Sequence, residues 1–290
     1  MSVKEVGYNE GTRTGQAGRQ LHYCEWTPSG KPKGLVVIAH GYAEHSGRYS
    51  ALANDLAGHG YAVAALDHHG HGKSEGKAVS VRRFDDYVDD LRDYMNDVRP
   101  RYNVPTFLLG HSMGGLISLR YVTREQPDLA GLVVSATAAS RPPDVSGATI
   151  FVGRILSRVA PDAGILALPL DKISRDPRVV KAYNDDPLVH ARKMRARLGA
   201  EILDTIDLVA PALADLKLPM LIIHGGDDVI SVADNSRLIY ERSGTADKTL
   251  EIYDGLWHEV FNEPERDKVL ADLVGWLDQH VPTLSGRTLS

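Results

Sequence analysis

The 290-residue sequence has few of the features that mark several classes of protein. Cys24 is its only cysteine, so no disulfide can form within the chain, and a disulfide-stapled secreted domain is excluded. No apolar run is long enough to cross a bilayer. The first fifteen residues also lack the apolar core of a signal peptide. We therefore expect a soluble protein, either cytoplasmic or associated peripherally with a membrane or the cell envelope.

An excess of positive charge is also missing. The formal net charge is −5, whereas proteins that bind nucleic acids are usually basic, so we expect no nucleic-acid partner. What the sequence does contain is ordinary globular composition, with 43% hydrophobic and 24% charged residues. That is enough apolar material for one large buried core.

Short apolar runs recur along the chain, separated by longer amphipathic stretches. Several runs are continuously apolar, which is typical of parallel strands buried on both faces. Alternating strands and helices predict an α/β fold with a mostly parallel central sheet flanked by helices. The expected strands are Leu35–Ala39, Ala62–Leu66, Thr106–Leu109, Leu132–Ser135, Met220–Ile223 and Leu250–Tyr253.

One long region interrupts this alternation. Residues 140–211 contain no convincing strand and are punctuated by prolines, and the region is too long for a simple loop. We expect it to form an inserted helical cap, with residues 1–139 and 212–290 forming the core. Apolar side chains in the insertion are predicted either to pack the cap onto the core, or to form a hydrophobic channel or a surface that meets lipid. The main apolar stretch comprises Ile150, Phe151, Val152, Ile155, Leu156 and Val159.

A candidate nucleophile lies in the sequence Gly110-His111-Ser112-Met113-Gly114. This G-x-S-x-G pattern follows an expected strand and precedes a helix-like run, the context that a nucleophile elbow requires. A sharp turn from strand to helix strains the backbone at the serine, and glycine on either side relieves the crowding. The helix that begins after Ser112 would direct its positive end toward a developing oxyanion.

A serine hydroxyl needs a histidine to accept its proton, and that histidine needs a carboxylate to fix its tautomer. In this fold the chain order is serine, acid, histidine. His258 follows the last expected strand and is our candidate base, since His224 ends a strand and His280 lies on the terminal helix, which favours structural or solvated roles for both. The acid should follow the strand that ends near Ile223. Asp227 and Asp228 both stand there, and spacing does not distinguish them.

Two backbone N–H groups are expected to form the oxyanion hole. Met113 follows the nucleophile and should supply one donor. The loop after Leu35–Ala39 should supply the second, and we assign it to Tyr42 because Gly41 lets the backbone turn toward the site.

With these residues placed, the sequence resembles the monoacylglycerol lipases over most of its length. The GHSMGG elbow is shared by many hydrolases, whereas the loop Gly70-His71-Gly72 with Ser74-Glu75-Gly76 and the cap motif at 183–188 are more specific. The resemblance implies the α/β-hydrolase fold and selects Asp228 as the acid through a G-x-x-D pattern that starts at Gly225. It also implies that Tyr183 contacts the glycerol head group. The remaining expected substrate contacts are Glu44, His45, Arg48, Ile150 and Leu156.

We therefore predict a monoacylglycerol lipase that works through an acyl-enzyme on Ser112, with a small lipid as its substrate. Alternatives within the fold are a lysophospholipase, a broad carboxylesterase or thioesterase, or a peptidase for N-terminal proline. A non-catalytic lipid-binding receptor is the alternative from another class. We expect no cofactor, because the acyl-enzyme mechanism needs none. We also expect no metal, because His68, His69 and His71 lack a matching acidic or cysteine set.

The expected cap is basic although the chain is acidic. Between Arg141 and Ala200 there are eleven Lys and Arg against six Asp and Glu, a local excess of five positive charges. Basic groups beside an apolar face favour anionic membrane surfaces, so peripheral contact through the cap is a further prediction. The alternative is a solvated helical surface.

Overall fold

The computed structural model describes residues 6–141, 147–190 and 193–281. Some residues of the expected cap, including Pro142, Pro143, Asp144 and Arg192, lie outside the described residues. In the described part, no helix is long and apolar enough to cross a membrane.

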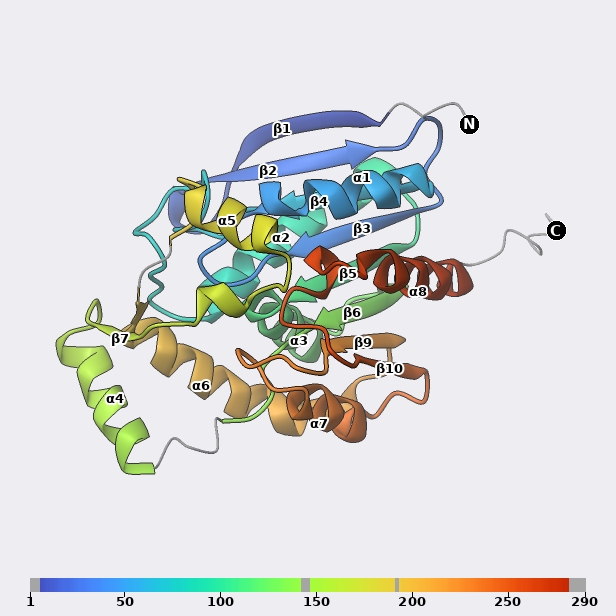
Figure 1. Cartoon of the computed structure of the whole chain (residues 1–290). Helices are drawn as coiled ribbons and strands as arrows, with labels where there is room; N and C mark the ends of the chain where they lie inside the picture. The colour runs from blue at the N-terminus through green and yellow to red at the C-terminus, as the bar shows by residue number, and fades with distance from the viewer. Residues whose placement is uncertain (1–5, 142–146, 191–192, 282–290) are drawn as a thin grey trace.

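The centre of the described structure is a mixed, mostly parallel sheet of eight strands in the order β1-β2-β4-β3-β5-β6-β9-β10 (Figure 1). The pairs β1–β2 and β2–β4 are antiparallel, and every other neighbouring pair is parallel. The predicted parallel sheet is therefore confirmed, with an antiparallel hairpin at one edge. The strands are β1 Gly7–Thr14, β2 Gln20–Thr27, β3 Gly34–Ala39, β4 Tyr61–Leu66, β5 Thr106–His111, β6 Gly131–Ser135, β9 Met220–Gly225 and β10 Lys248–Tyr253.

Strand β3 shows why these sequences form central strands. All six of its residues are buried, and successive side chains point to opposite faces of the sheet. Leu35 and Val37 contribute to one hydrophobic core, whereas Val36 and Ile38 contribute to the other. Burying both faces requires the continuously apolar sequence from which the strand was predicted.

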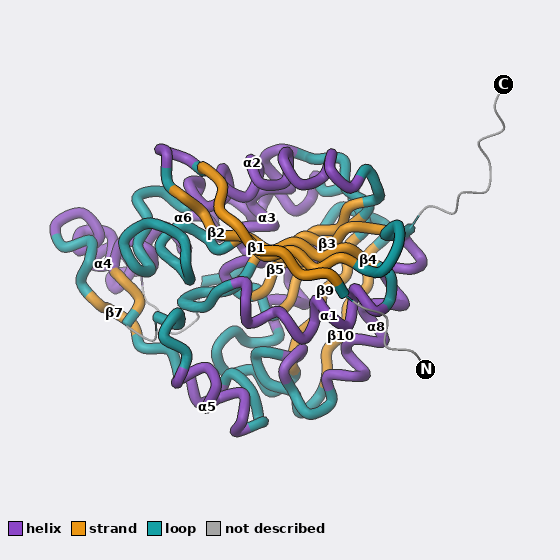
Figure 2. The backbone as a smooth tube through the Cα atoms, turned by 90° about the horizontal axis from the view of Figure 1, so that it is seen from above, coloured by secondary structure: helices purple, strands orange, loops and turns teal. Residues whose placement is uncertain are grey.

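Helices cover both faces of the sheet. Seen from above, α2 and α3 lie on one side of the strands, and α1 and α8 lie on the other (Figure 2). The two hydrophobic cores fill the spaces between the sheet and these helix layers. The helices of this part are α1 Ser50–Gly58, α2 Asp85–Tyr102, α3 Met113–Glu125, α7 Asp234–Arg242 and α8 Arg266–His280, with short 3-10 turns η1 Gln16–Gly18, η2 Ser46–Tyr49, η4 Leu213–Asp215 and η5 Val260–Asn262.

Between β6 and β9 the chain forms a mainly helical insertion. It contains α4 Gly147–Val159, β7 Gly164–Leu166, η3 Leu170–Lys172, α5 Pro177–Asp185, β8 Met194–Arg195 and α6 Ala196–Ala212. Helix α6 packs against both α3 and α4, which places α4 at the outer edge of the molecule (Figure 1). The expectation that this region has no strand was wrong, because β7 and β8 pair as a short antiparallel ladder. Strands of three and two residues are too short to leave a periodic signal in the sequence.

Candidate active site

Ser112 lies at the tight turn between β5 and α3. Its φ of 53° and ψ of −118° fall in a region that non-glycine residues rarely adopt, which places strain at this residue. The turn packs too tightly for larger neighbours: a Cβ at Gly114 would lie 2.0 Å from the carbonyl oxygen of Ala39, and one at Gly110 would lie 2.5 Å from that of Gly114. Both glycines are therefore needed for the close packing of this elbow.

His258 and Asp228 form a buried pair. His258 Nδ1 lies 2.7 Å from Asp228 Oδ2, and their residues are 5% and 4% exposed. The neighbouring Asp227 is exposed. Of the two aspartates that the position of the turn did not distinguish, Asp228 is therefore the one that faces His258, and Asp227 faces water. The imidazole rings of His258 and His111 are 4.8 Å apart, which brings His258 beside the turn that carries Ser112.

The direction of the hydrogen bonds fixes the tautomer of His258. An ionised carboxylate only accepts, so the proton of the Asp228 bond is carried by Nδ1, and Nε2 keeps its lone pair. Burial alone would lower the pKa of His258, but the charge and hydrogen bond of Asp228, together with the charges of Glu259 and Glu44, outweigh burial and raise that pKa. The arrangement thus supplies a base whose protonated form is stabilised by a fixed carboxylate.

Asp228 accepts four hydrogen bonds. Oδ1 accepts from the backbone N–H of Ile230 and Ser231, at 2.7 and 3.0 Å. Oδ2 lies 3.1 Å from His224 Nε2 as well as facing His258. Burial raises the pKa of Asp228, but the charge of His258 and these hydrogen bonds lower that pKa by more than burial raises it. The carboxylate therefore stays ionised.

His224 was expected to be structural or solvated, and the structure gives it a structural place beside the acid. It is fully buried, with Nδ1 2.6 Å from the hydroxyl of Ser236 and Nε2 2.5 Å from the carbonyl oxygen of Ser231. Because that carbonyl and Asp228 both accept, Nε2 carries the proton and Ser236 donates to Nδ1. His224 therefore helps to fix the orientation of Asp228.

The loop after β3 approaches the elbow from the other side. A Cβ on Gly41 would lie 3.3 Å from Ser112 Cβ, so the loop passes directly beside the nucleophile. Glu44 Oε1 accepts from the N–H of Gly41 at 2.6 Å and from the hydroxyl of Tyr49 at 2.8 Å. Tyr42 is buried in this loop, and Met113 is the first residue of α3. Their roles as oxyanion donors stay predictions.

Arg48 links two other predicted contact residues, Glu44 and Tyr183, and also Glu259 into one largely buried network. Its guanidinium binds Glu44 at 2.6 Å and Glu259 at 2.7 Å, and it stacks over the ring of Tyr183 with 4.4 Å to the centroid. Although burial favours the neutral acid, Arg48 lowers the pKa of Glu44 to about 2. Tyr183 belongs to α5, so this network joins the insertion to the core.

His45 makes a second link across the same boundary, because its Nε2 lies 2.8 Å from Asp186 Oδ2 just after α5. The two apolar residues predicted to contact substrate lie elsewhere. Ile150 is buried and Leu156 is half-buried on α4, the helix that packs against α6. Contact of any of these residues with a substrate stays a prediction.

Three residues at the site were missed as site residues from the sequence. Glu259 completes the Arg48 network, His224 binds the acid, and His111 packs against the base. The position of Glu259 directly after His258 was a usable signal, because a carboxylate in a buried turn needs a cation. The partner, Arg48, is 211 residues away, and no local pattern identifies it.

Comparison with known proteins identifies the family of the chain. Residues 30–265 match the sequence model of a family described as serine aminopeptidase, S33. A monoacylglycerol lipase of Mycolicibacterium smegmatis is 38% identical over 274 residues, covering 94% of this chain and 98% of the relative. A monoglyceride lipase of Rattus norvegicus is 33% identical, covering 99% and 96%. The solved monoacylglycerol lipase of Paleococcus ferrophilus superposes with a TM-score of 0.77 at 31% identity, covering 95% and 99%.

The sheet, its helix layers and the serine turn define an α/β-hydrolase of the serine type. Within that class, the chain belongs to the serine aminopeptidase S33 family, and its resemblance to the monoacylglycerol lipases is confirmed.

Proposed function

We propose that the protein is a monoacylglycerol lipase, which hydrolyses a monoacylglycerol to a fatty acid and glycerol. The observation that carries the proposal is the buried Asp228–His258 pair beside the strained Ser112 turn. The 38% identity to a monoacylglycerol lipase supports the choice of substrate.

In this mechanism His258 Nε2 accepts the proton of the Ser112 hydroxyl while the serine oxygen attacks the ester carbonyl. The N–H groups of Met113 and Tyr42 stabilise the oxyanion, and each donor of this kind typically contributes about 3–4 kcal/mol. His258 then protonates the departing glycerol oxygen. Water hydrolyses the acyl-enzyme with the same base, which restores Ser112 and releases the fatty acid.

The network around Arg48 lies at the end of the site that we assign to glycerol. A small cavity there is lined in part by Glu44, Arg48, His111 and Glu259. These charged and polar groups suit a hydroxylated leaving group. Apolar residues of the insertion, among them Ile150 and Leu156, would accompany the acyl chain.

The substrate assignment is tested by fatty-acid release from monooleoylglycerol, dioleoylglycerol and trioleoylglycerol in one detergent. Release from the monoester alone is the expected result, and Ser112→Ala should abolish it. Equal release from the triester would indicate a broader lipase. If all three esters are inert while a fluorophosphonate still labels Ser112, the substrate is another acyl compound such as a lysophospholipid or a proline peptide. A protein that is neither labelled nor active would be a binding protein.

We also propose that residues 140–211 act as a cap whose outer face binds anionic membrane surfaces. Four apolar side chains of α4 are exposed instead of packed onto the core: Phe151, Val152, Ile155 and Val159, at 65%, 61%, 46% and 74%. Ile165 and Leu166 of β7 are also about half exposed. An exposed apolar face beside a local excess of positive charge suits a lipid headgroup layer.

Flotation with vesicles tests this surface. The wild-type protein should float with vesicles that contain phosphatidylglycerol, less so at high salt, and the double variant Phe151→Ser/Val159→Ser should float poorly. Val229→Ser is the matched control, because Val229 is 63% exposed but lies outside the cap. Equal flotation of all three proteins would reject this membrane surface.

A further inference from the structure

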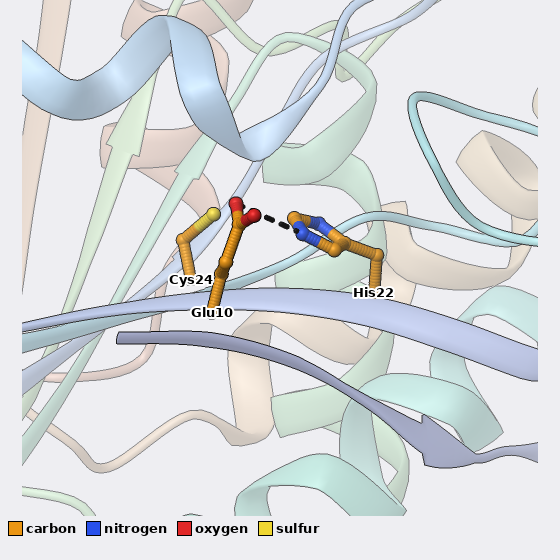
Figure 3. Close-up of side chains that lie close together, drawn as sticks. All are labelled: Glu10, His22 and Cys24. Atoms are coloured by element: carbon orange, nitrogen blue, oxygen red, sulfur yellow. Dashed lines mark ion pairs between the residues drawn. The ribbon is translucent and has the colours of Figure 1, made fainter. Parts of the chain in front are cut away.

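A second group of reactive side chains lies on the N-terminal hairpin and includes none of the residues assigned to the active site. Glu10 of β1 and Cys24 of β2 are paired directly across the two strands. His22 precedes Cys24 by two residues, so both side chains point to the same face of β2. Figure 3 shows the three side chains on the same side of the hairpin, and one ligand atom from each lies within 4.8 Å of the others.

His22 is the unusual member of this group. The residue is only 6% exposed, yet within the described part of the chain neither ring nitrogen has a hydrogen-bond partner. Nε2 lies 3.4 Å from Glu10 Oε2, and Nδ1 lies 3.2 Å from Asp67 Oδ2. The buried ring thus faces two carboxylates without a well-formed hydrogen bond to either, and a cation bound to Nε2 would lie between that nitrogen and the Glu10 carboxylate.

The group already attracts a positive charge. The ammonium of Lys73 lies 2.9 Å from Glu10 Oε2, and both side chains are more than 40% exposed, so the pair can separate without disturbing the core. The Tyr8 hydroxyl donates to the same carboxylate and lies 3.3 Å from Cys24 Sγ. Burial raises the pKa of the Cys24 thiol, so a cation must displace the thiol proton in order to bind sulfur.

We propose that Glu10, His22 and Cys24 form a zinc site, with water as the fourth ligand. One sulfur, one nitrogen and one oxygen donor suit Zn²⁺ and disfavour Mg²⁺ and Ca²⁺, which prefer oxygen. On binding, the Cys24 thiol releases its proton to solvent, His22 donates the Nε2 lone pair, and the Lys73 ammonium moves into water. The three ligand atoms would move together until they are separated by roughly 3.3–3.8 Å, as in a tetrahedral zinc site.

Asp67 provides the orienting partner that zinc-bound histidines usually have. With zinc on Nε2, the His22 proton resides on Nδ1 and is donated to Asp67 Oδ2. The same carboxylate accepts from the backbone N–H of Ser46 at 2.7 Å and of Lys73 at 2.9 Å. Zinc would therefore clamp β1 to β2 and, through Asp67, to the loop that follows β3. This proposal departs from the sequence-based expectation of no metal, and it does not depend on the substrate.

Titration with Co²⁺ tests the site directly. Because Cys24 is the only cysteine, a thiolate-to-cobalt charge-transfer band in the near ultraviolet can come from this residue alone. We expect one equivalent of Co²⁺ to produce the band, Zn²⁺ to displace it, and Cys24→Ser to abolish it. His22→Ala and Glu10→Ala should raise the Kd for Zn²⁺ by more than the about 10–100-fold typical of losing a residue that only orients a ligand. His59→Ala, at an exposed position, is the matched control.

The variant Lys73→Met distinguishes a zinc site from a cluster that only stabilises the fold. Removing the competing ammonium should tighten Zn²⁺ binding and leave far-UV circular dichroism unchanged. Absence of the cobalt band in the wild-type protein, or Zn²⁺ binding that Glu10→Ala and Lys73→Met leave unchanged, would overturn the proposal. Both of those positions are exposed, so this outcome can be read even if the buried variants fail to fold.

Discussion

Arg48 and Glu259 form a two-bond ion pair, with 2.7 Å at each guanidinium nitrogen, although 211 residues separate them. Glu44 contacts the same guanidinium, so one buried cation lies between two buried carboxylates. The loop after β3 and the turn that carries His258 thereby share one electrostatic contact. The contact thereby ties the turn of the predicted base to the loop from which we expect an oxyanion donor.

Arg48→Ala should destabilise the fold strongly. Removing the cation leaves Glu44 and Glu259 buried without compensation, and breaking a buried pair in this way typically costs about 3–5 kcal/mol. Urea unfolding measures the change. The surface variant Arg178→Ala, in an ion pair whose arginine is 90% exposed, should stay within about 0.5 kcal/mol of wild type. If both variants lose a similar free energy of unfolding, the Arg48 network contributes no more to stability than an exposed ion pair.

Asp228→Asn should reduce kcat by about 10⁴-fold with little change in KM, because an amide no longer fixes the His258 tautomer that presents Nε2 to the serine. Hydrolysis of a soluble p-nitrophenyl ester measures the loss. Asp227→Asn changes the adjacent, exposed residue and should retain nearly full activity. If the two variants lose activity equally, the assignment of the acid is wrong.

The pH dependence of the wild-type enzyme should report His258. The base acts only when neutral, and Asp228 raises its pKa, so kcat/KM should rise with pH through a midpoint above the 6.5 of an ordinary histidine. In Asp228→Asn the raising charge is gone and burial lowers the pKa. The residual activity should then have its midpoint at lower pH. A midpoint that is the same in both enzymes would assign the titration to another group.

The strands that were predicted from the sequence are those that stand out as short runs of mainly apolar residues. Apolar runs identified the strands β3 to β6 and β9, because burial on both faces leaves little room for polar residues. The edge strand β10 was also identified, although it contains Lys248 and Glu251 and most of its residues are half-buried. Strands β1 and β2 were not predicted. The residues of β1 are mostly exposed and polar, and β2 carries His22 and Glu25 among its apolar residues, so neither forms a continuous apolar run.

Some residues of the candidate site could likewise be predicted from local sequence patterns, whereas others depend on tertiary packing. Ser112 and His258 were proposed from the elbow and from the turn after the last strand, both of which are local. Asp227 and Asp228 are adjacent and chemically identical, so only the resemblance distinguished them before the structure placed Asp228 beside His258. The pairing of Arg48 with Glu259 arises from tertiary packing, and it leaves no periodic pattern in the sequence.

Two Gly→Ala substitutions should change stability in opposite directions. A methyl group at Gly114 would lie 2.0 Å from the carbonyl oxygen of Ala39 and 2.4 Å from that of His40, and this backbone cannot yield without moving the nucleophile turn. Gly114→Ala should therefore destabilise the protein by about 2 kcal/mol or more and suppress labelling of Ser112.

Gly275 lies inside α8, and the space that a Cβ would occupy there is open, so Gly275→Ala should stabilise the fold by about 0.5–1 kcal/mol through helix propensity alone. Urea unfolding of both variants, together with fluorophosphonate labelling, separates the two effects. Unchanged labelling in Gly114→Ala would mean that the elbow tolerates a side chain, and the close packing of α3 against β3 would then not be what positions Ser112.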